Sequence, residues 1–439
     1  MRNKIIIILA GLLFLAGCQH KIEPIQLKEY VIGDVDTIVI DEKYVQHYYA
    51  GLFMAVEEIN RAGGVNGIPL KVEVKSDFAN HREAYLAADY LLKQKNAIVL
   101  VGTSIPQTTF GVARYANDNK IPFLNTGSLS EEIITGSQAN DFTFRVREGY
   151  GLHLKAIAED IAQNKGLKSL VVLTYSNEDG IKQAKEFKAL IKKSRPDITF
   201  AKDVYIASHK GMFDNTAKDV QYSFTGGVVI LINGDDVLDV MKNLQTQRAT
   251  IGKSVYLMLG GEPEWVRSLQ GLTPDNWVVT GSPYYVDGGE KNREFVKKYQ
   301  AKYKSLLPQH SSYIGYTTGY LIADALRKSR PTANNEKNRL ALAKALESAS
   351  FDSPVGLVQM RLDHQSNMGT YIGMLQPYNT PIRGSNKVRG DVRMANTRAV
   401  DANMLLESPK KVNKMRQKEI AVMKKAEANK RHITPRGEN

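Results

Sequence analysis

Short apolar segments alternate with longer amphipathic segments along most of the chain, between about residues 30 and 376. The short segments are rich in β-branched residues and continuously apolar, which predicts strands buried on both faces, as in parallel sheets. The longer segments carry apolar residues at helical spacing and predict helices. The clearest predicted strands are residues 97–101, 121–124, 170–173, 227–232, 255–259 and 277–280. The clearest predicted helices are residues 49–62, 82–94, 151–164, 180–193, 235–247, 292–304, 313–329 and 336–349.

This alternation of strands and helices predicts the α/β fold class with parallel sheets. Two lobes accommodate the predicted strands more economically than one open sheet does. Ligands of such folds bind beside the carboxyl ends of the parallel strands. The segments that directly follow the predicted strands are rich in glycine, hydroxyl, amide or acidic residues. These candidate contact loops are residues 102–109, 125–130, 175–180, 233–236 and 260–264.

The first 18 residues have the form of an export signal. Two basic residues precede an apolar stretch at residues 5–15, which is too short to span a membrane as a helix. The sequence Leu-Ala-Gly-Cys at residues 15–18 resembles the lipobox of bacterial lipoproteins, which implies that Cys18 carries lipid and becomes the mature N-terminus. An ordinary signal peptide or a buried cysteine is the alternative. By the same resemblance, Gln19 implies the outer membrane of a Gram-negative cell, with residues 19–28 as a tether.

Composition narrows the function classes further. Hydrophobic residues make up 43% and charged residues 24% of the 439 residues, which excludes wholesale disorder. Cys18 is the sole cysteine of the sequence, so neither an intramolecular disulfide nor a cysteine zinc site is expected. The net charge of +13 is concentrated in residues 377–439, which hold 15 basic and 6 acidic residues. The rest of the chain is nearly neutral, which argues against a nucleic-acid-binding protein.

The basic tail divides into two parts. Residues 377–409 are rich in glycine, asparagine and arginine with little periodicity, and they predict a linker. Residues 410–432 contain strong helix formers with a thin apolar stripe, and they predict a helix. Such a helix either contacts anionic lipid or an acidic partner, or remains a solvated tail, and the sequence leaves both open.

One family resemblance covers about residues 36–376. Residues 55–70, which read Ala-Val-Glu-Glu-Ile-Asn-Arg-Ala-Gly-Gly-Val-Asn-Gly-Ile-Pro-Leu, resemble the first helix and turn of type I periplasmic binding proteins of the leucine/isoleucine/valine-binding branch. Further similar segments follow in the family's order at residues 97–104, 119–128, 315–320 and 363–365.

The resemblance implies two Rossmann-like lobes joined by three crossings, with the ligand enclosed in the cleft between them. The expected lobe one is residues 29–146 and 284–350, and the expected lobe two is residues 147–283 and 351–376. Ligand contacts to both lobes would then favour the closed state over the open one.

The resemblance also implies where the ligand binds. It places a ligand carboxylate beside Ser104, Gln107 and Thr108, and beside Gly127 and Ser128 in the next contact loop. Hydroxyls and backbone N–H groups suit a carboxylate. Ordinary helix capping explains a serine or threonine at such positions equally well, and both explanations stand.

Two further contacts come from the same resemblance. It places an aromatic wall at Tyr44, although residues 38–41 lack the family's usual Gly-Pro-rich turn. It also places an acid beside the ligand ammonium at Glu262, for which a surface loop acid is the alternative. A buried ammonium needs such a partner, because removing it from water without one is costly.

Asp179 and Asn233 depart from the family, which frequently has aromatic residues at these positions. If Asp179 faces the cleft with Glu262 and the nearby Asp235 and Asp236, we expect a polar or cationic ligand rather than a leucine-like one. The alternative for Asp235 and Asp236 is a role as first-turn acids of a helix, where the helix dipole favours them.

Catalytic signals are weak, because the eight histidines are dispersed without metal-ligand spacing and neither a nucleophile elbow nor a phosphate-binding loop appears. We therefore expect no enzyme activity, no cofactor and no metal. The favoured function is a lipid-anchored receptor that delivers a small amino-acid-like ligand to an ABC-type permease. The alternative is a sensor or scaffold lipoprotein of the same fold that regulates an envelope partner. Both place the protein at the cell envelope, facing the periplasm, held to the membrane by lipid on Cys18.

Overall fold

The computed structural model describes most of the chain beyond the predicted leader. Described are residues 27–37, 42–207, 213–234, 236–262, 269, 272, 274, 276–283, 285–286, 289–304, 306–381, 388–405 and 407–433. Cys18, Gln19 and the predicted tether up to residue 26 lie outside these residues. Among the helices of the described part, none combines the length and the apolarity that crossing a membrane requires.

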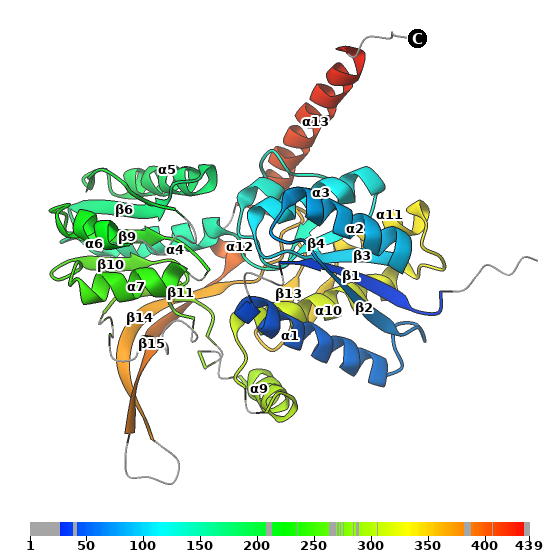
Figure 1. Ribbon diagram of the computed structural model, residues 1–439, viewed down its shortest axis with the longest axis horizontal. Coiled ribbons are helices and arrows are strands. Elements are labelled where there is room, and N and C mark those ends of the chain that lie inside the picture. Colours follow the sequence, from blue (N-terminus) through cyan, green and yellow to red (C-terminus); the bar gives the residue numbers. More distant parts are fainter. Residues whose placement is uncertain are drawn as a thin grey trace, which may run out of the picture.

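The first lobe is built on a five-stranded parallel sheet with the order β2-β1-β3-β4-β5 (Figure 1). Its strands are β1 (Tyr30–Asp36), β2 (Leu70–Ser76), β3 (Ala97–Gly102), β4 (Phe123–Asn125) and β5 (Thr143–Arg145). Its helices are α1 (Glu42–Arg61), α2 (His81–Lys95), α3 (Pro106–Asn119), α9 (Glu290–Lys302), α10 (His310–Ser329) and α11 (Glu336–Leu346), with a 3₁₀ turn at Glu131–Ile133. Every residue of β3 is buried, because helices cover both faces of this sheet.

Helices α1 and α10 pack together at the distance of backbone contact. A Cβ atom added at Gly51 would lie 1.9 Å from the Ser312 carbonyl oxygen, and one added at Gly315 would lie 2.2 Å from the Tyr48 carbonyl oxygen. Only glycine, which lacks this atom, allows such an approach. The contact fixes α10 to the first lobe, although most of the second lobe separates the two helices in the sequence.

The second lobe contains a larger, mixed sheet with the order β15-β14-β11-β10-β9-β6-β7, in which β8 also pairs with β6. Its parallel strands are β6 (Ser169–Tyr175), β7 (Thr199–Phe200), β8 (Val204–Ile206), β9 (Gly227–Leu231), β10 (Ser254–Leu257) and β11 (Val278–Gly281). The antiparallel strands are β14 (Thr370–Pro381) and β15 (Val388–Val400). The helices are α4 (Tyr150–Gln163), α5 (Glu178–Ser194), α6 (Asp214–Gln221) and α7 (Asp236–Thr246).

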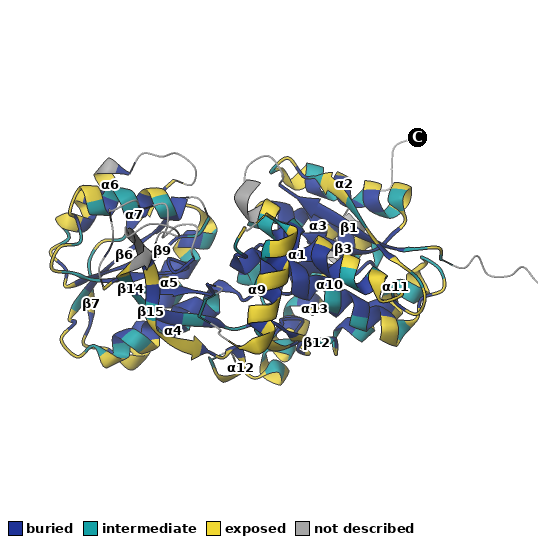
Figure 2. Ribbon diagram, turned by 90° about the horizontal axis from the view of Figure 1, so that it is seen from below, coloured by how far each residue is buried: buried dark blue, intermediate teal, exposed yellow. Residues whose placement is uncertain are grey.

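Up to β14 the chain passes between the lobes in three segments. These run from β5 to α4, from β11 to α9, and from β13 (Gly356–Gln359) to β14. Strand β13 pairs with β12 (Ser350–Ser353) beside the first lobe. Figure 2 displays the two lobes side by side, each with its own buried interior. The lobes also touch, because Ser130 Oγ donates to Asp179 Oδ1 at 3.2 Å and Lys182 forms an ion pair with Glu132.

The structure confirms the predicted α/β class with parallel sheets in two lobes. Each of the eight predicted helices overlaps an observed helix, and the predicted helix at residues 82–94 matches α2 within one residue at either end. The predicted C-terminal helix at residues 410–432 is confirmed as α13 (Pro409–Ile433), which follows the short α12 (Ala402–Leu405).

Two predicted segments differ from the structure. Residues 377–409 are not a linker, since β14 and β15 form a long hairpin there. The sequence analysis did not predict these strands, because only alternate positions in them are apolar. Val392 and Met394 are buried, whereas Arg393 between them is exposed. Residues 351–368 also pack with the first lobe rather than the second, because Val358, Met360 and Met368 join the first lobe's core.

Candidate ligand-binding site

The loop between β3 and α3 holds three of the predicted ligand contacts. Ser104 is half-buried, and its hydroxyl donates a hydrogen bond to Asp36 Oδ1 at the end of β1. Thr108 is buried, and its hydroxyl donates at 3.1 Å to the backbone carbonyl three residues earlier. The side chain of Gln107 is exposed, and the backbone carbonyl oxygen of this residue lies 3.1 Å from His81 Nδ1. Both hydroxyls therefore already have partners within the protein.

The loop after β4 lies directly against the loop after β3. A Cβ atom added at Gly127 would lie 2.4 Å from the Thr103 carbonyl oxygen and 2.7 Å from the Ser104 Cα, so the contact requires glycine. Ser128 is buried, and its N–H donates to Asn125 Oδ1 at 3.1 Å, while Asn125 Nδ2 donates to the Ser128 carbonyl at 2.7 Å. The structure thus places Gly127 against Thr103 and Ser104, and the binding of a ligand by these residues stays a prediction.

Three fully buried carboxylates lie at this edge of the first sheet, at Asp34, Asp36 and Asp77. The Tyr49 hydroxyl donates to Asp34 Oδ1 at 3.0 Å, and the Thr37 hydroxyl donates to Asp77 Oδ1 at 2.8 Å. Burial, together with the nearby charge of Asp36, raises the pKa of Asp34 well above its ordinary value. This carboxylate cluster makes the edge acidic where the resemblance placed a ligand carboxylate.

Glu262 follows β10 and is only 5% exposed. Its Oε1 accepts a hydrogen bond of 2.9 Å from the Ser282 N–H, whereas its Oε2 has no hydrogen-bond partner among the described residues. Burial raises the pKa of Glu262, and the charge of Glu148 raises it further, while His310 and Arg147 oppose the shift. The site therefore contains a buried carboxylate oxygen that can accept a hydrogen bond from a ligand.

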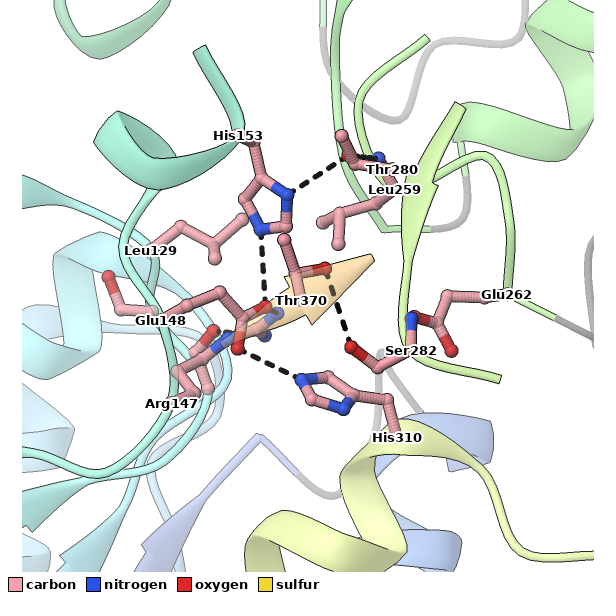
Figure 3. A network of polar contacts seen from close by, with 12 residues as sticks. Leu129, Arg147, Glu148, His153, Leu259, Glu262, Thr280, Ser282, His310 and Thr370 are labelled. Atoms are coloured by element: carbon pink, nitrogen blue, oxygen red, sulfur yellow. Dashed lines mark hydrogen bonds and ion pairs between the residues drawn. The ribbon is translucent and has the colours of Figure 1, made fainter. Parts of the chain in front are cut away.

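Beside Glu262 lies a second buried acid, Glu148, in the first segment between the lobes (Figure 3). Its Oε1 lies 3.1 Å from Arg147 Nη2 and 3.2 Å from His153 Nε2 on α4. Its Oε2 lies 2.9 Å from His310 Nε2 at the start of α10. One carboxylate thus joins the beginning of a helix in each lobe. We refer to Arg147, Glu148, His153, Glu262 and His310 as the hinge cluster.

The charges of the hinge cluster determine one another's protonation. Burial by itself would raise the pKa of Glu148, but the charges of His310 and Arg147 outweigh burial and hold this pKa well below its ordinary value. Burial would likewise lower the pKa of His310, but the Glu148 carboxylate outweighs it and raises this pKa. Each of the two groups therefore favours the charged form of the other.

Contacts extend from the hinge cluster into both lobes. Arg147 Nη1 donates at 2.9 Å to the carbonyl of Gly127, which joins the cluster to the loop beside Ser104. His153 Nδ1 lies 3.0 Å from Thr280 Oγ1 at the end of β11. The Ser282 hydroxyl, in the second segment between the lobes, donates at 3.4 Å to Thr370 Oγ1 in the third.

The other predicted site residues lie elsewhere or are less fully described. Asp179 is half-buried and accepts hydrogen bonds from Ser130 at 3.2 Å and from Gln183 at 3.3 Å, while burial raises its pKa. The Asn233 carbonyl accepts a hydrogen bond of 2.6 Å from the Tyr175 hydroxyl. Tyr44 falls within α1, but its side chain lies outside the described residues, as does Asp235.

Two pockets are resolved near these elements. A pocket of about 240 Å³ lies beside the second and third segments between the lobes, and Ser282, His310 and Thr370 contribute to its lining. A pocket of about 380 Å³ lies on the second lobe and includes Asp160 and Tyr256. Within the described part of the chain, no group of histidine, cysteine or acidic residues is arranged to hold a metal ion.

Sequence reasoning missed the hinge cluster apart from Glu262. Glu148 and His310 are 162 positions apart, and neither belongs to a motif with regular spacing. One signal was present: Arg147 and Glu148 are adjacent charges just before the predicted helix at residues 151–164, and the structure places them between β5, which ends at Arg145, and α4, which begins at Tyr150. Adjacent charges where a chain leaves a sheet toward a buried helix require internal partners.

Comparisons with known proteins agree with this architecture. The sequence profile of the family described as periplasmic binding protein matches residues 45–379. An amino acid binding protein of Pseudomonas aeruginosa is 28% identical over 88 residues, which cover 20% of this chain and 24% of that protein. The chain thus matches about a quarter of the length of this curated relative.

Solved structures with a similar fold have low sequence identity. A solute-binding protein of an ABC transporter from Rhodopseudomonas palustris, in complex with 3,4-dihydroxybenzoic acid, has a TM-score of 0.73 at 15% identity and covers 88% of this chain and 100% of its own. The branched-chain amino acid transporter substrate-binding protein LivJ of Streptococcus pneumoniae, in complex with isoleucine, has a TM-score of 0.69 at 18% identity and covers 85% and 100%. With the family profile matching most of the chain between α1 and β14, the protein belongs to the periplasmic binding protein family.

Proposed function

We propose that this protein is an extracytoplasmic solute-binding protein that captures a small, ammonium-bearing ligand between its lobes and presents it to an ABC-type permease. Family membership supports the binding role and the location outside the cytoplasm. The observation that carries the ligand class is Oε2 of Glu262, a carboxylate oxygen that has no hydrogen-bond partner among the described residues and belongs to a residue that is only 5% exposed.

A ligand ammonium would complete the hydrogen bonding of Glu262. Its Oε1 is held by the Ser282 N–H, which orients the carboxylate and leaves Oε2 as the available acceptor. A charge-assisted N–H···O bond to this oxygen would offset the desolvation of both groups. The raised pKa of Glu262 indicates that the ionised carboxylate is less stable in this buried site than in water. A bound cation would stabilise the ionised form.

The opposite edge of the candidate site supports the same ligand class. The hydroxyl of Ser104 already donates to Asp36, and Asp34 and Asp77 are buried nearby. A ligand carboxylate at this edge would face the charge of Asp36 and would have to compete for the Ser104 hydroxyl. Structures of this fold have been solved with an aromatic acid and with an amino acid, so the fold itself leaves the ligand class open.

Two measurements test the ligand class. Native mass spectrometry of protein purified without unfolding identifies any co-purified metabolite. Isothermal titration then compares lysine, ornithine and putrescine with leucine and benzoate. We expect the ammonium-rich compounds to bind and Glu262→Gln to weaken their binding by on the order of 2–5 kcal/mol, as expected for a buried charged contact. Glu178→Gln, at an exposed acid on α5, is the matched control. Tight binding of benzoate, or unchanged affinity in Glu262→Gln, would overturn the proposal.

Lipid attachment at Cys18 is a separate part of the proposal. It is supported by the resemblance of residues 15–18 to a lipobox. Growth with a radiolabelled fatty acid should label the wild-type protein and leave Cys18→Ser unlabelled, and fractionation of the envelope would identify the membrane. Labelling of Cys18→Ser would exclude this site, whatever the ligand proves to be.

A sensor or scaffold role is the second candidate function. It is favoured by the basic helix α13, which begins 30 residues after the end of the family match at residue 379. Transport predicts that loss of the protein reduces uptake of the ligand. A sensor role predicts unchanged uptake together with an altered activity of an envelope partner.

A further inference from the structure

The C-terminal segment is attached to both lobes. Strand β15 extends the sheet of the second lobe, where Val392 and Met394 join the core. At its end, Val400 packs with Leu152 on α4, and so does Ala402 two residues later. Lys155 Nζ, also on α4, donates at 2.9 Å to the carbonyl of Leu405. The segment therefore leaves the second lobe only after α12.

The next stretch contacts the third segment between the lobes. Arg361 Nη2 donates at 2.8 Å to the carbonyl of Glu407 and forms an ion pair of 2.8 Å with Asp363. Arg361 is 7% exposed and lies between β13 and β14, where the chain passes from the first lobe to the second. The C-terminal segment thus runs alongside an existing crossing.

Helix α13 then attaches to the first lobe through Arg416, whose side chain is only 1% exposed. Its guanidinium donates to the carbonyl of Asn140 and lies 2.9 Å from His364 Nδ1. The His364 ring stacks on Phe144 of β5, with ring centroids 3.9 Å apart. A buried, multiply bonded arginine is a firm attachment, because withdrawing it leaves the carbonyl unpaired and the pocket empty.

Further contacts continue the attachment along α13. Ile420 is buried, and Lys424 Nζ lies 3.2 Å from Asp141 Oδ2. Gln417 Nε2 donates at 3.3 Å to the other oxygen of Asp141. Figure 1 shows the remainder of α13 projecting away from the first lobe beyond these contacts.

We propose that residues 388–424 form a strap that ties the lobes together and limits how far they can open. The strap is a fourth passage of the chain between the lobes, and it lies outside the residues matched by the family profile. The two anchors, around Lys155 and Arg416, belong to different lobes, so a rotation of one lobe against the other stretches the strap or pulls Arg416 from its pocket. The strap therefore favours a narrow range of lobe angles, independently of which ligand binds.

Distances between labels on the two lobes test the strap. Cys18 is the sole cysteine of the sequence, so Cys18→Ser provides a background without thiols. In this background, Arg114→Cys on α3 and Lys185→Cys on α5 introduce one exposed spin-label site in each lobe. Double electron–electron resonance in the absence of ligand measures the distribution of the distance between them. We expect Arg416→Met to add a longer-distance population, while Lys418→Met, which removes an exposed charge from the same helix, reproduces the parent distribution.

A second variant keeps the test decisive if Arg416→Met fails to fold. Lys155→Met removes the bond that holds Leu405 to α4, so the part of the strap between Ala402 and Arg416 can extend. It leaves the contacts of Arg416 intact and should broaden the same distance distribution. Circular dichroism establishes that each variant is folded. The proposal is wrong if folded Arg416→Met has the same distance distribution as the labelled protein without this substitution. If Arg416→Met does not fold, the same result in Lys155→Met would overturn it. In either case α13 contacts the first lobe without restricting the angle between the lobes.

Discussion

Glu148 and Glu262 are both buried in the hinge cluster, yet their surroundings are opposite. Both oxygens of Glu148 are bound, one by Arg147 and His153 and the other by His310. Glu262 has one backbone N–H on Oε1 and, among the described residues, no hydrogen-bond partner on Oε2. The pKa of Glu148 is accordingly held well below its ordinary value, whereas burial raises that of Glu262.

These surroundings distinguish an acid with a structural role, Glu148, from an acid that is available to a ligand, Glu262. A buried carboxylate that is fully paired stabilises the contact between the elements that supply its partners. A buried carboxylate with an unpaired oxygen costs free energy until something binds it. Glu148 therefore holds α4 and α10 at the junction of the lobes, and Glu262 is the acceptor we assign to the ligand.

Removing the charge of Glu148 should have the largest effect on stability. Glu148→Gln leaves Arg147 and His310 without their shared anion, and we expect a loss of about 3–5 kcal/mol in the free energy of unfolding, as for other broken buried pairs. Urea denaturation at neutral pH measures this loss. Glu159→Gln, at a half-exposed acid on α4, is the control and should stay close to wild type. If both variants lost a similar amount of unfolding free energy, Glu148 would contribute no more to stability than an exposed acid does.

The pair of Glu148 and His310 also predicts a pH dependence. The folded-state pKa of His310 is raised, so its stabilisation is fully present below the ordinary histidine value of 6.5 and disappears as the pH rises through the folded-state value. At the acidic end, it disappears as the pH falls through the depressed pKa of Glu148. We expect His310→Gln to be less stable than wild type by about 1–2 kcal/mol at pH 6.

The stability difference between wild type and His310→Gln should shrink steadily as the pH is raised from 6 to 9. Thermal unfolding across this range provides the measurement, with His81→Gln, at an exposed histidine, as the control. A difference that stays constant with pH would mean that the packing of the His310 ring, and not its charge, stabilises the fold.

Glu262 should behave in the opposite way when no ligand is present. Its raised folded-state pKa means that the ionised carboxylate costs stability above the ordinary value of 4.5, and that this cost disappears at lower pH. Glu262→Gln keeps an acceptor for the Ser282 N–H, so we expect it to be more stable than wild type by about 1 kcal/mol at neutral pH. The gain should vanish near pH 4. A destabilised Glu262→Gln would show that the acid has a structural role like that of Glu148.

Ser104 should give the smallest effect on ligand binding. Because its hydroxyl already donates to Asp36, we expect Ser104→Ala to change the affinity by less than about 1 kcal/mol, whereas Glu262→Gln changes it by several. Titration with the ligand identified by mass spectrometry measures both. A large loss in Ser104→Ala alone would move the principal ligand contact to the first lobe.

Much of the fold could be predicted because its signals are local. Residues 97–101 are continuously apolar and form a strand covered on both faces, and residues 82–94 carry their apolar positions at helical spacing. The hairpin of β14 and β15 escaped prediction because its strands face the core with alternate residues only, and charged residues such as Arg393 occupy the exposed face.

The candidate site was only partly predictable, since its charges come from distant segments. Glu262 was found through the family resemblance, but its partnership with Glu148 and His310 depends on three segments that meet only in the folded chain. Asp36 was not among the predicted site residues, and its bond to Ser104 could not be predicted from either residue, because β1 and β3 pair only in the folded sheet.

The backbone contacts of Gly51 with Ser312 and of Gly315 with Tyr48 also constrain the acidic edge of the first lobe. Because α1 and α10 approach to backbone contact at these glycines, the helix pair fixes the position of Tyr49, which binds Asp34, relative to that of His310, which pairs with Glu148. A larger residue at either glycine would push the two helices apart and shift Tyr49 and His310 relative to their acid partners. Gly51 and Gly315 therefore set the geometry of two acid contacts although neither glycine has a side chain that could reach them.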